Sequence, residues 1–89
     1  MIKFTKHARE MLAQRHIAEK KVVDCINSPD LTKPGNQSEQ VFYKDFGGNM
    51  LKVVVAIEDK TYHVIILHWV AKKEEESKEV KLVYENNLR

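Results

Sequence analysis

The sequence has little of what marks several classes of protein. Its single cysteine, Cys25, excludes an intramolecular disulfide and a zinc site built from thiolates. It lies in an apolar helical pattern, which indicates a buried, inert thiol. No apolar run approaches the roughly 20 residues that a membrane helix needs, and the opening MIKFTKHARE is too polar for a secretory signal. We therefore expect a cytoplasmic protein with no membrane partner.

Glycine and proline are also scarce, at three and two residues, and no glycine-rich phosphate-binding loop is present. The four histidines lack a metal-ligand spacing such as HExxH, so we expect no metal and no cofactor. With 89 residues, 43% of them hydrophobic and 31% charged, the chain fits one globular domain over residues 1–89. The net charge of +2 permits nucleic-acid binding but does not argue for it.

The central feature is the Val-rich stretch Met50–Val70, which predicts two strands joined by a two-residue turn at Asp59-Lys60. Counting outward from that turn, four pairs share one face: Ile57–Tyr62, Val55–Val64, Val53–Ile66 and Leu51–His68. We expect this apolar face to contact the core, with His68 at its end. The other face holds Lys52 and His63 and is expected to be open or functional. His63 and His68, five residues apart on a strand, are expected on opposite faces.

Two short helices are expected before the sheet. Thr5 can cap the first, Lys6 to Arg15, and the second runs from Glu19 to Asn27 before Ser28-Pro29. Together they form a helical hairpin over residues 6–28 that must bury its apolar stripe. The predicted fold is α+β, with this N-terminal hairpin packed on one face of an antiparallel sheet of three to four strands over residues 39–84.

The remaining elements follow from turn signals and alternation. Ile2–Phe4 is a candidate edge strand, and Asp30–Ser38, with Pro34-Gly35-Asn36, reads as a surface loop. Glu39–Phe46 alternates as a strand and turns at Gly47-Gly48 into the Val-rich hairpin. Val80–Tyr84 is expected to be a last strand.

Four side chains suggest chemistry, each with an ordinary structural alternative. His7, in the first helical turn near the positive end of the dipole, should resist protonation and can act as a general base. Otherwise it only makes a hydrogen bond. Arg15 either meets the carbonyls at the helix end or holds a phosphate. The Gly47-Gly48 turn places Tyr43 opposite Lys52, which suits an acid–base or anion-stabilising site as well as an ordinary cross-strand pair.

The order of these features resembles a known family. The resemblance rests on His7-Ala8-Arg9-Glu10-Met11 with Arg15, on the Asn27-Ser28-Pro29-Asp30 stop, and on Tyr43–Gly48 before the Val-rich hairpin. It covers about Phe4 to Val70. The family is an uncharacterised group of small bacterial and archaeal proteins related to the RelE/ParE-like plasmid toxin superfamily.

The resemblance implies metal-free RNA cleavage, in which a base takes the proton of a ribose 2′-hydroxyl, cations stabilise the phosphate and an acid protonates the leaving oxygen. It implies His7 or Tyr43 as the acid–base groups and Lys52 as a catalytic cation. Arg15 would bind the substrate phosphate, and His68 is a further candidate. The partner would be RNA or a ribosome. Because the helices cover the other face, His7 joins Lys52 only around a sheet edge, so two half-sites are as consistent as one.

ParE-type toxins share this fold without cutting RNA, so the resemblance also implies an alternative. The chain would then be a protein-binding module that contacts an antitoxin or forms a homodimer. Its interface would be the open face with Val54, Ile65, Leu67 and Trp69, because exposed apolar patches usually mean a partner.

Overall fold

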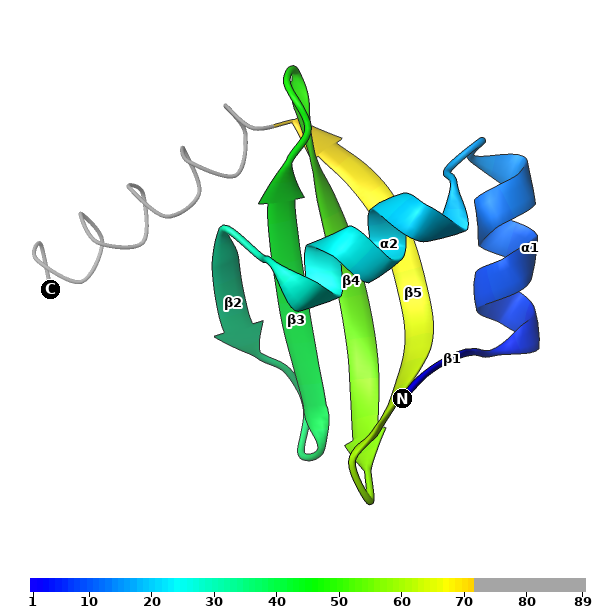
Figure 1. The fold of residues 1–89 in the computed structure, drawn as a ribbon, viewed down its shortest axis with the longest axis vertical. Helices are drawn as coiled ribbons and strands as arrows, with labels where there is room; N and C mark the ends of the chain where they lie inside the picture. Colours follow the sequence, from blue (N-terminus) through cyan, green and yellow to red (C-terminus); the bar gives the residue numbers. More distant parts are fainter. Residues whose placement is uncertain (72–89) are drawn as a thin grey trace, which may run out of the picture.

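The computed structural model describes residues 1–71 of the chain, and a five-stranded sheet is its main element (Figure 1). The strand order across the sheet is β1-β5-β4-β3-β2. The strands are β1 (Ile2–Phe4), β2 (Leu31–Pro34), β3 (Glu39–Asp45), β4 (Asn49–Glu58) and β5 (Thr61–Ala71). Two helices, α1 (Lys6–Gln14) and α2 (Glu19–Asn27), connect β1 to β2. The predicted strand Val80–Tyr84 lies outside the described residues.

The predicted architecture, a helical hairpin on a three- to four-stranded antiparallel sheet, is wrong. The sheet is mixed and has five strands, because β1 precedes the helices and pairs in parallel with β5. At the other edge, β2 pairs with β3 where a surface loop was expected. The Pro34-Gly35-Asn36 signal ends this short strand instead of replacing it. About half of the described residues lie in strands, which makes the fold strand-dominated.

The tight turn at Asp59-Lys60 is confirmed. Both residues have positive φ, 48° and 67°, as a two-residue hairpin with the twist of a sheet requires. From this turn the predicted register holds as far as the pair Val55–Val64. Ile65 is then the extra residue of a β-bulge, because the next pair is Val54 with Ile66.

The bulge exchanges the two faces of β5 beyond Val64. The predicted pairs Val53–Ile66 and Leu51–His68 are wrong, since Leu67 and Trp69 occupy those places. Leu67 and Trp69 therefore face the helices, where Leu67 is fully buried. His68 lies opposite Lys52 and shares a face with His63, contrary to the expectation that the two histidines are on opposite faces.

The helices cover one face of the sheet, with α1 against β5 and β1 and α2 across β3 and β4 (Figure 1). The Thr5 hydroxyl accepts the Ala8 N–H at 3.1 Å, which confirms the predicted N-cap. Met11 covers the edge of β5, because its sulfur accepts the Leu67 N–H at 3.5 Å. No helix in the described part of the chain has the length and apolar character needed to span a membrane.

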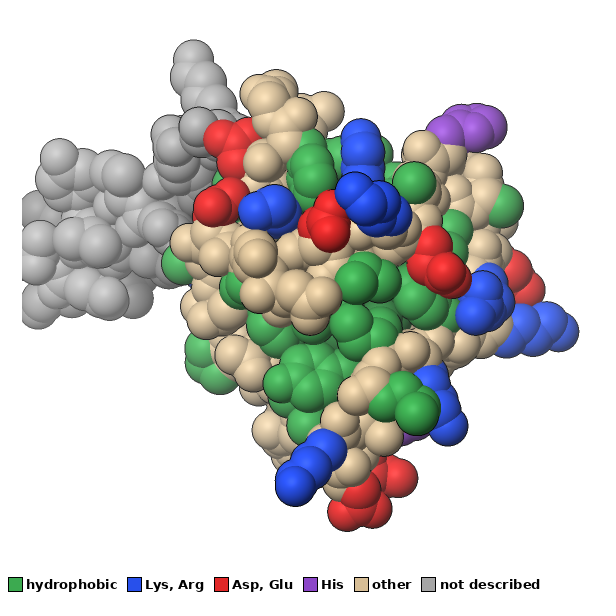
Figure 2. All heavy atoms as spheres, in the orientation of Figure 1, with side chains coloured by type: hydrophobic (Ala, Val, Ile, Leu, Met, Phe, Trp, Pro, Cys, Tyr) green, Lys and Arg blue, Asp and Glu red, His purple; other side chains and the backbone are tan. Residues whose placement is uncertain are grey.

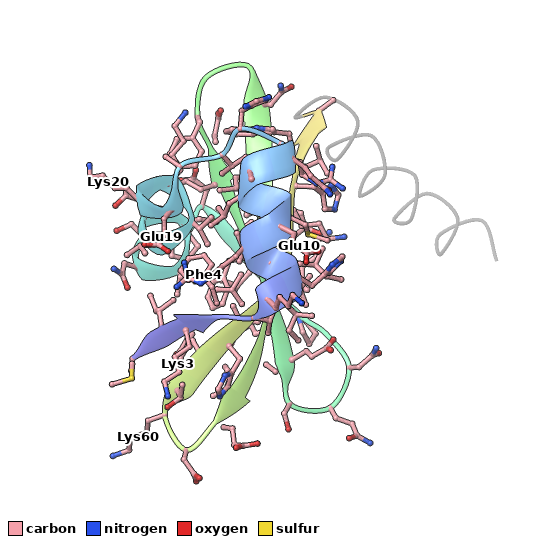
Figure 3. The ribbon with its side chains drawn as sticks, turned by 90° about the vertical axis from the view of Figure 1, so that its right-hand side faces the viewer. Lys3, Phe4, Glu10, Glu19, Lys20 and Lys60 are labelled. Carbon is pink, nitrogen blue, oxygen red and sulfur yellow. The ribbon has the colours of Figure 1, made fainter. Side chains whose placement is uncertain are left out.

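A salt bridge joins the two helices. Arg9 Nη1 of α1 lies 3.1 Å from Glu19 Oε1 of α2, and its guanidinium stands 5.4 Å from the centre of the Phe4 ring. Figure 3 shows Glu19 and Phe4 on the same side of α1. One side chain therefore connects both helices to β1, which fixes the start of the chain against the sheet.

Cys25 is fully buried in α2, as predicted, with its Sγ 3.6 Å from the Leu51 carbonyl oxygen. Burial raises the pKa of its thiol from 9.0 to about 12; the charge of Lys44 lowers it and that of Asp30 raises it. The pKa of the thiol is thus higher in the folded than in the unfolded protein. Its contribution to the free energy of unfolding is fully present below the unfolded pKa. That stabilisation is lost as the pH rises through 9 toward 12.

We therefore expect the free energy of unfolding to fall between pH 9 and pH 10, with the thiol contributing roughly 1 kcal/mol of the loss. Urea unfolding at pH 8, 9 and 10 measures this loss. Because lysines and tyrosines also titrate in this range, the control is Cys25→Ala, whose decline should be shallower by that amount. Parallel pH slopes for the two proteins would contradict the assignment.

Candidate functional site

The face of the sheet opposite the helices, called the outer face below, brings several predicted site residues together. Tyr43 of β3 pairs with Lys52 of β4, and Lys52 pairs in turn with His68 of β5. The first pairing follows from the Gly47-Gly48 turn, as predicted. The second depends on the bulge at Ile65. Tyr43, Lys52 and His68 thus form one row across three strands.

Tyr43 is almost completely buried, with 4% of its surface exposed, and two lysines flank its ring. Lys33 Nζ of β2 lies 5.4 Å from the ring centre and Lys52 Nζ lies 6.0 Å from it. Both distances permit attraction between the ammonium groups and the ring face. The ring packs in a small apolar cluster with Val41, Met50 and Val54. The Tyr43 ring therefore holds two ammonium groups next to an apolar cluster. Two neighbouring positive charges favour the binding of an anion.

Lys52 lies at the centre of the row and is partly exposed. Among residues 1–71, no carboxylate lies within ion-pair distance of its ammonium group. Next to it, His68 Nδ1 lies 3.3 Å from the backbone oxygen of Trp69. If Nδ1 donates to that oxygen, Nε2 carries the lone pair and can take a proton. The row thus combines a cation with a candidate base.

The structure does not bring His7 and Arg15 into this row. His7 is exposed in the first turn of α1, where its Nδ1 lies 3.9 Å from Glu10 Oε2. Arg15 is the C-cap of α1, and its backbone N–H donates to the Met11 oxygen at 2.9 Å. The helix α1 packs on the face of the sheet opposite the outer face. The predicted residues therefore divide into two groups, one on α1 and one on the outer face. This is the half-site arrangement that the sequence left open.

Lys33 belongs to the site, although it lies in Asp30–Ser38, a stretch that predicted a surface loop. The signal was the alternation Leu31-Thr32-Lys33-Pro34, in which the first and third side chains are half-buried and the others exposed. Asp30, just before this strand, helps to place it. Its Oδ2 accepts the Asp45 N–H at 2.8 Å.

The predicted protein interface also changes. Leu67 and Trp69 face the helices because of the bulge, so they share no surface with Val54. The exposed apolar side chain of the outer face is Ile66, at 37%. Within residues 1–71, no three side chains of His, Cys, Asp or Glu are grouped so as to hold a metal ion.

The fold and the site define a small mixed-sheet protein whose outer face holds the row of Tyr43, Lys52 and His68, with Lys33 beside Tyr43. A family model for a domain of unknown function, DUF4258, matches residues 4–69, so the chain belongs to that family. The expected membership of an uncharacterised family is thereby confirmed. No curated protein and no solved structure matches the chain. The kinship with RelE/ParE toxins stays a prediction.

Proposed function

We propose that the protein is a RelE-like, metal-independent ribonuclease whose site is the outer-face row of Tyr43, Lys52 and His68 together with Lys33. The observation that carries the proposal is the row itself. Two ammonium groups and an imidazole share one face of a rigid sheet, with the cations fixed against one aromatic ring. RNA cleavage needs these groups: a base, and positive charge beside the phosphate.

In the proposed reaction, His68 Nε2 takes the proton from a ribose 2′-hydroxyl. The 2′-oxygen attacks the adjacent phosphorus, and Lys52 stabilises the added negative charge of the pentacoordinate phosphate. The bond to the 5′-oxygen breaks, and that oxygen takes a proton from the lysine pair. The products are a 2′,3′-cyclic phosphate and a 5′-hydroxyl. Tyr43 is a positioning residue here, because its ring is buried between Lys33 and Lys52.

The proposed setting is the cytoplasm, with RNA or ribosome-bound messenger as substrate and an antitoxin as the protein that restrains the activity. The resemblance to RelE-type toxins supports these choices. His7 has no role in the proposal, since it lies on the helix side of the sheet and is exposed beside Glu10.

The test is incubation of the purified protein with end-labelled single-stranded RNA, with and without EDTA. We expect cleavage that resists the chelator and leaves 2′,3′-cyclic phosphate ends. The same assay on ribosome-bound messenger covers the case in which the ribosome completes the site. An absence of cleavage on both substrates by a folded protein would refute the proposal.

One observation favours a second candidate, a non-catalytic binding module. Ile66 is exposed on the outer face, where it pairs with Val54 of the small apolar cluster. Such a patch suits a second copy of the chain or an antitoxin. Under this alternative, Ile66→Lys lowers the self-association measured by sedimentation, whereas Lys52→Met does not.

A further inference from the structure

A cluster of two aromatic rings and a lysine lies on the helix side, where β5 and the β3–β4 connection meet. The Phe46 and Trp69 rings stand edge to face, with centres 5.9 Å apart and planes at 89°. Lys21 of α2 places its Nζ 5.4 Å from each ring centre. Lys21 is exposed, and both rings are half-buried. Figure 2 shows basic and acidic side chains interspersed over α2 on this side of the molecule.

The charge of Lys21 has no acidic partner in residues 1–71, unlike its neighbours on the helices. Lys20 Nζ lies 3.8 Å from Asp24 Oδ2, and Arg9 pairs with Glu19. Lys21 instead lies over the two rings. A cation beside partly exposed π surfaces matches the two halves of a nucleotide, because a base stacks on a ring while its phosphate meets the ammonium group.

The turn that follows Phe46 is built from two glycines. A side chain built at Gly47 or Gly48, the residues that follow Phe46, would meet no atom within 4 Å. Gly47 has φ +109°, which favours glycine, and its N–H donates to Asp45 Oδ1 at 2.8 Å. The turn is therefore small and held in place.

The cluster is next to the proposed cleavage row. Trp69 follows His68 on β5, about 3.3 Å further along, and points to the opposite face. Arg15, the C-cap of α1, lies at the end of the helix that packs against β5. Met11 contacts Leu67, and α1 and β5 run in the same direction (Figure 1). Four residues of helix advance about 6 Å, and two residues of strand advance about 6.6 Å.

We propose that Phe46, Trp69 and Lys21 form a stacking subsite for one base of a single-stranded RNA, with Lys21 meeting its phosphate. The inference rests on the proposed ribonuclease function and specifies its substrate. Because Trp69 and His68 lie on opposite faces, a strand that stacks on Trp69 reaches His68 and Lys52 by passing around the edge of β5. A duplex does not fit this subsite, because its bases are already stacked and paired.

Trp69 is the single tryptophan of the chain, so its fluorescence reports directly on the subsite. The probe is a 2′-O-methyl RNA decamer, which cannot be cut because its 2′-oxygens carry no proton. We expect saturable quenching of the Trp69 emission by the single strand, and little by the same decamer in a duplex. Equal quenching by both forms, or none by either, would overturn the inference.

Matched lysine variants locate the binding. Lys21→Ala should weaken the binding of a labelled decamer, measured by anisotropy, by roughly fivefold or more, because it removes the ammonium group that meets the phosphate. Phe46→Leu, which keeps the apolar volume but removes the ring, should act in the same direction. Lys20→Ala, one residue away on the same helix, should leave binding unchanged. If Lys21→Ala and Lys20→Ala behave alike, the subsite is wrong.

The two proposals fail separately. Quenching by the decamer without cleavage of unmodified RNA would refute the ribonuclease and keep the base-stacking site. Cleavage of unmodified RNA without quenching would refute the stacking site and keep the ribonuclease. Lys52 lies on the other face of the sheet. The Lys52→Met variant should therefore retain the quenching of Trp69 while losing the cleavage of RNA.

Discussion

Replacing Lys52 with methionine is expected to lower the rate of RNA cleavage by roughly 100- to 1,000-fold while the protein stays folded. Loss of one group that stabilises developing negative charge has about this effect in other enzymes. Methionine keeps an unbranched apolar stem beside Tyr43 and His68, so the packing of the outer face is preserved. The rate is measured on end-labelled RNA at saturating protein, and the fold by circular dichroism and thermal unfolding.

The control for this substitution is Lys20→Met, since Lys20 lies on α2, across the sheet, with its side chain 87% exposed. It should cleave like the wild type. Lys52→Arg retains the charge and should recover part of the lost rate, whereas a merely structural lysine would show no such rescue. A Lys52→Met protein that cuts as fast as the Lys20→Met control would remove Lys52 from the site.

Local signals in the sequence were sufficient for most of the individual elements. Both helices were located from signals at their ends. Thr5 precedes the apolar stripe of the first helix, and Ser28-Pro29 follows that of the second. The two turns, Gly47-Gly48 and Asp59-Lys60, fixed the pairing of β4 with its neighbours close to each turn. Information of this kind is short in range, because a turn of known length sets the register only as far as the strands stay regular.

The sheet as a whole could not be predicted in this way. Nothing marks the bulge, since Ile65-Ile66 is a pair of identical strand-forming residues without glycine or proline. Only packing against the helices decides that Leu67, and not Ile66, enters the core. The parallel partner of β1 is equally hidden, because Ile2–Phe4 meets Tyr62–Val64 far along the chain.

The candidate site shows the same division. The pair Tyr43–Lys52 was predicted because a tight turn separates the two strands. His68 was a predicted site residue, but it was expected at the end of the core face. It lies in the row on the outer face because of the bulge. Lys33 was missed with β2. His7 was a candidate because of its place in the first helical turn, and its separation from Lys52 followed from the expectation that the helices cover the other face of the sheet.

Leu67→Ala is expected to destabilise the protein by about 2–5 kcal/mol, a large part of the stability of a small domain. Leu67 is fully buried, and its N–H donates to the Met11 sulfur, so truncation leaves a cavity between β5 and α1. Urea unfolding followed by circular dichroism measures the loss. The strongly destabilised variant should unfold at a much lower urea concentration, with a similar dependence of free energy on denaturant.

Ile66→Ala is the matched control, because the neighbouring side chain has the same number of carbons and lies on the outer face with 37% of its surface exposed. The bulge predicts that this truncation costs less than about half as much as Leu67→Ala, since little of the removed volume is enclosed. A strand without the bulge would place Ile66 opposite Val53 in the core and reverse the order of the two variants. Without the bulge His68 would also point away from Lys52, and the proposed cleavage row would not exist. This pair of unfolding curves therefore tests the site without any RNA.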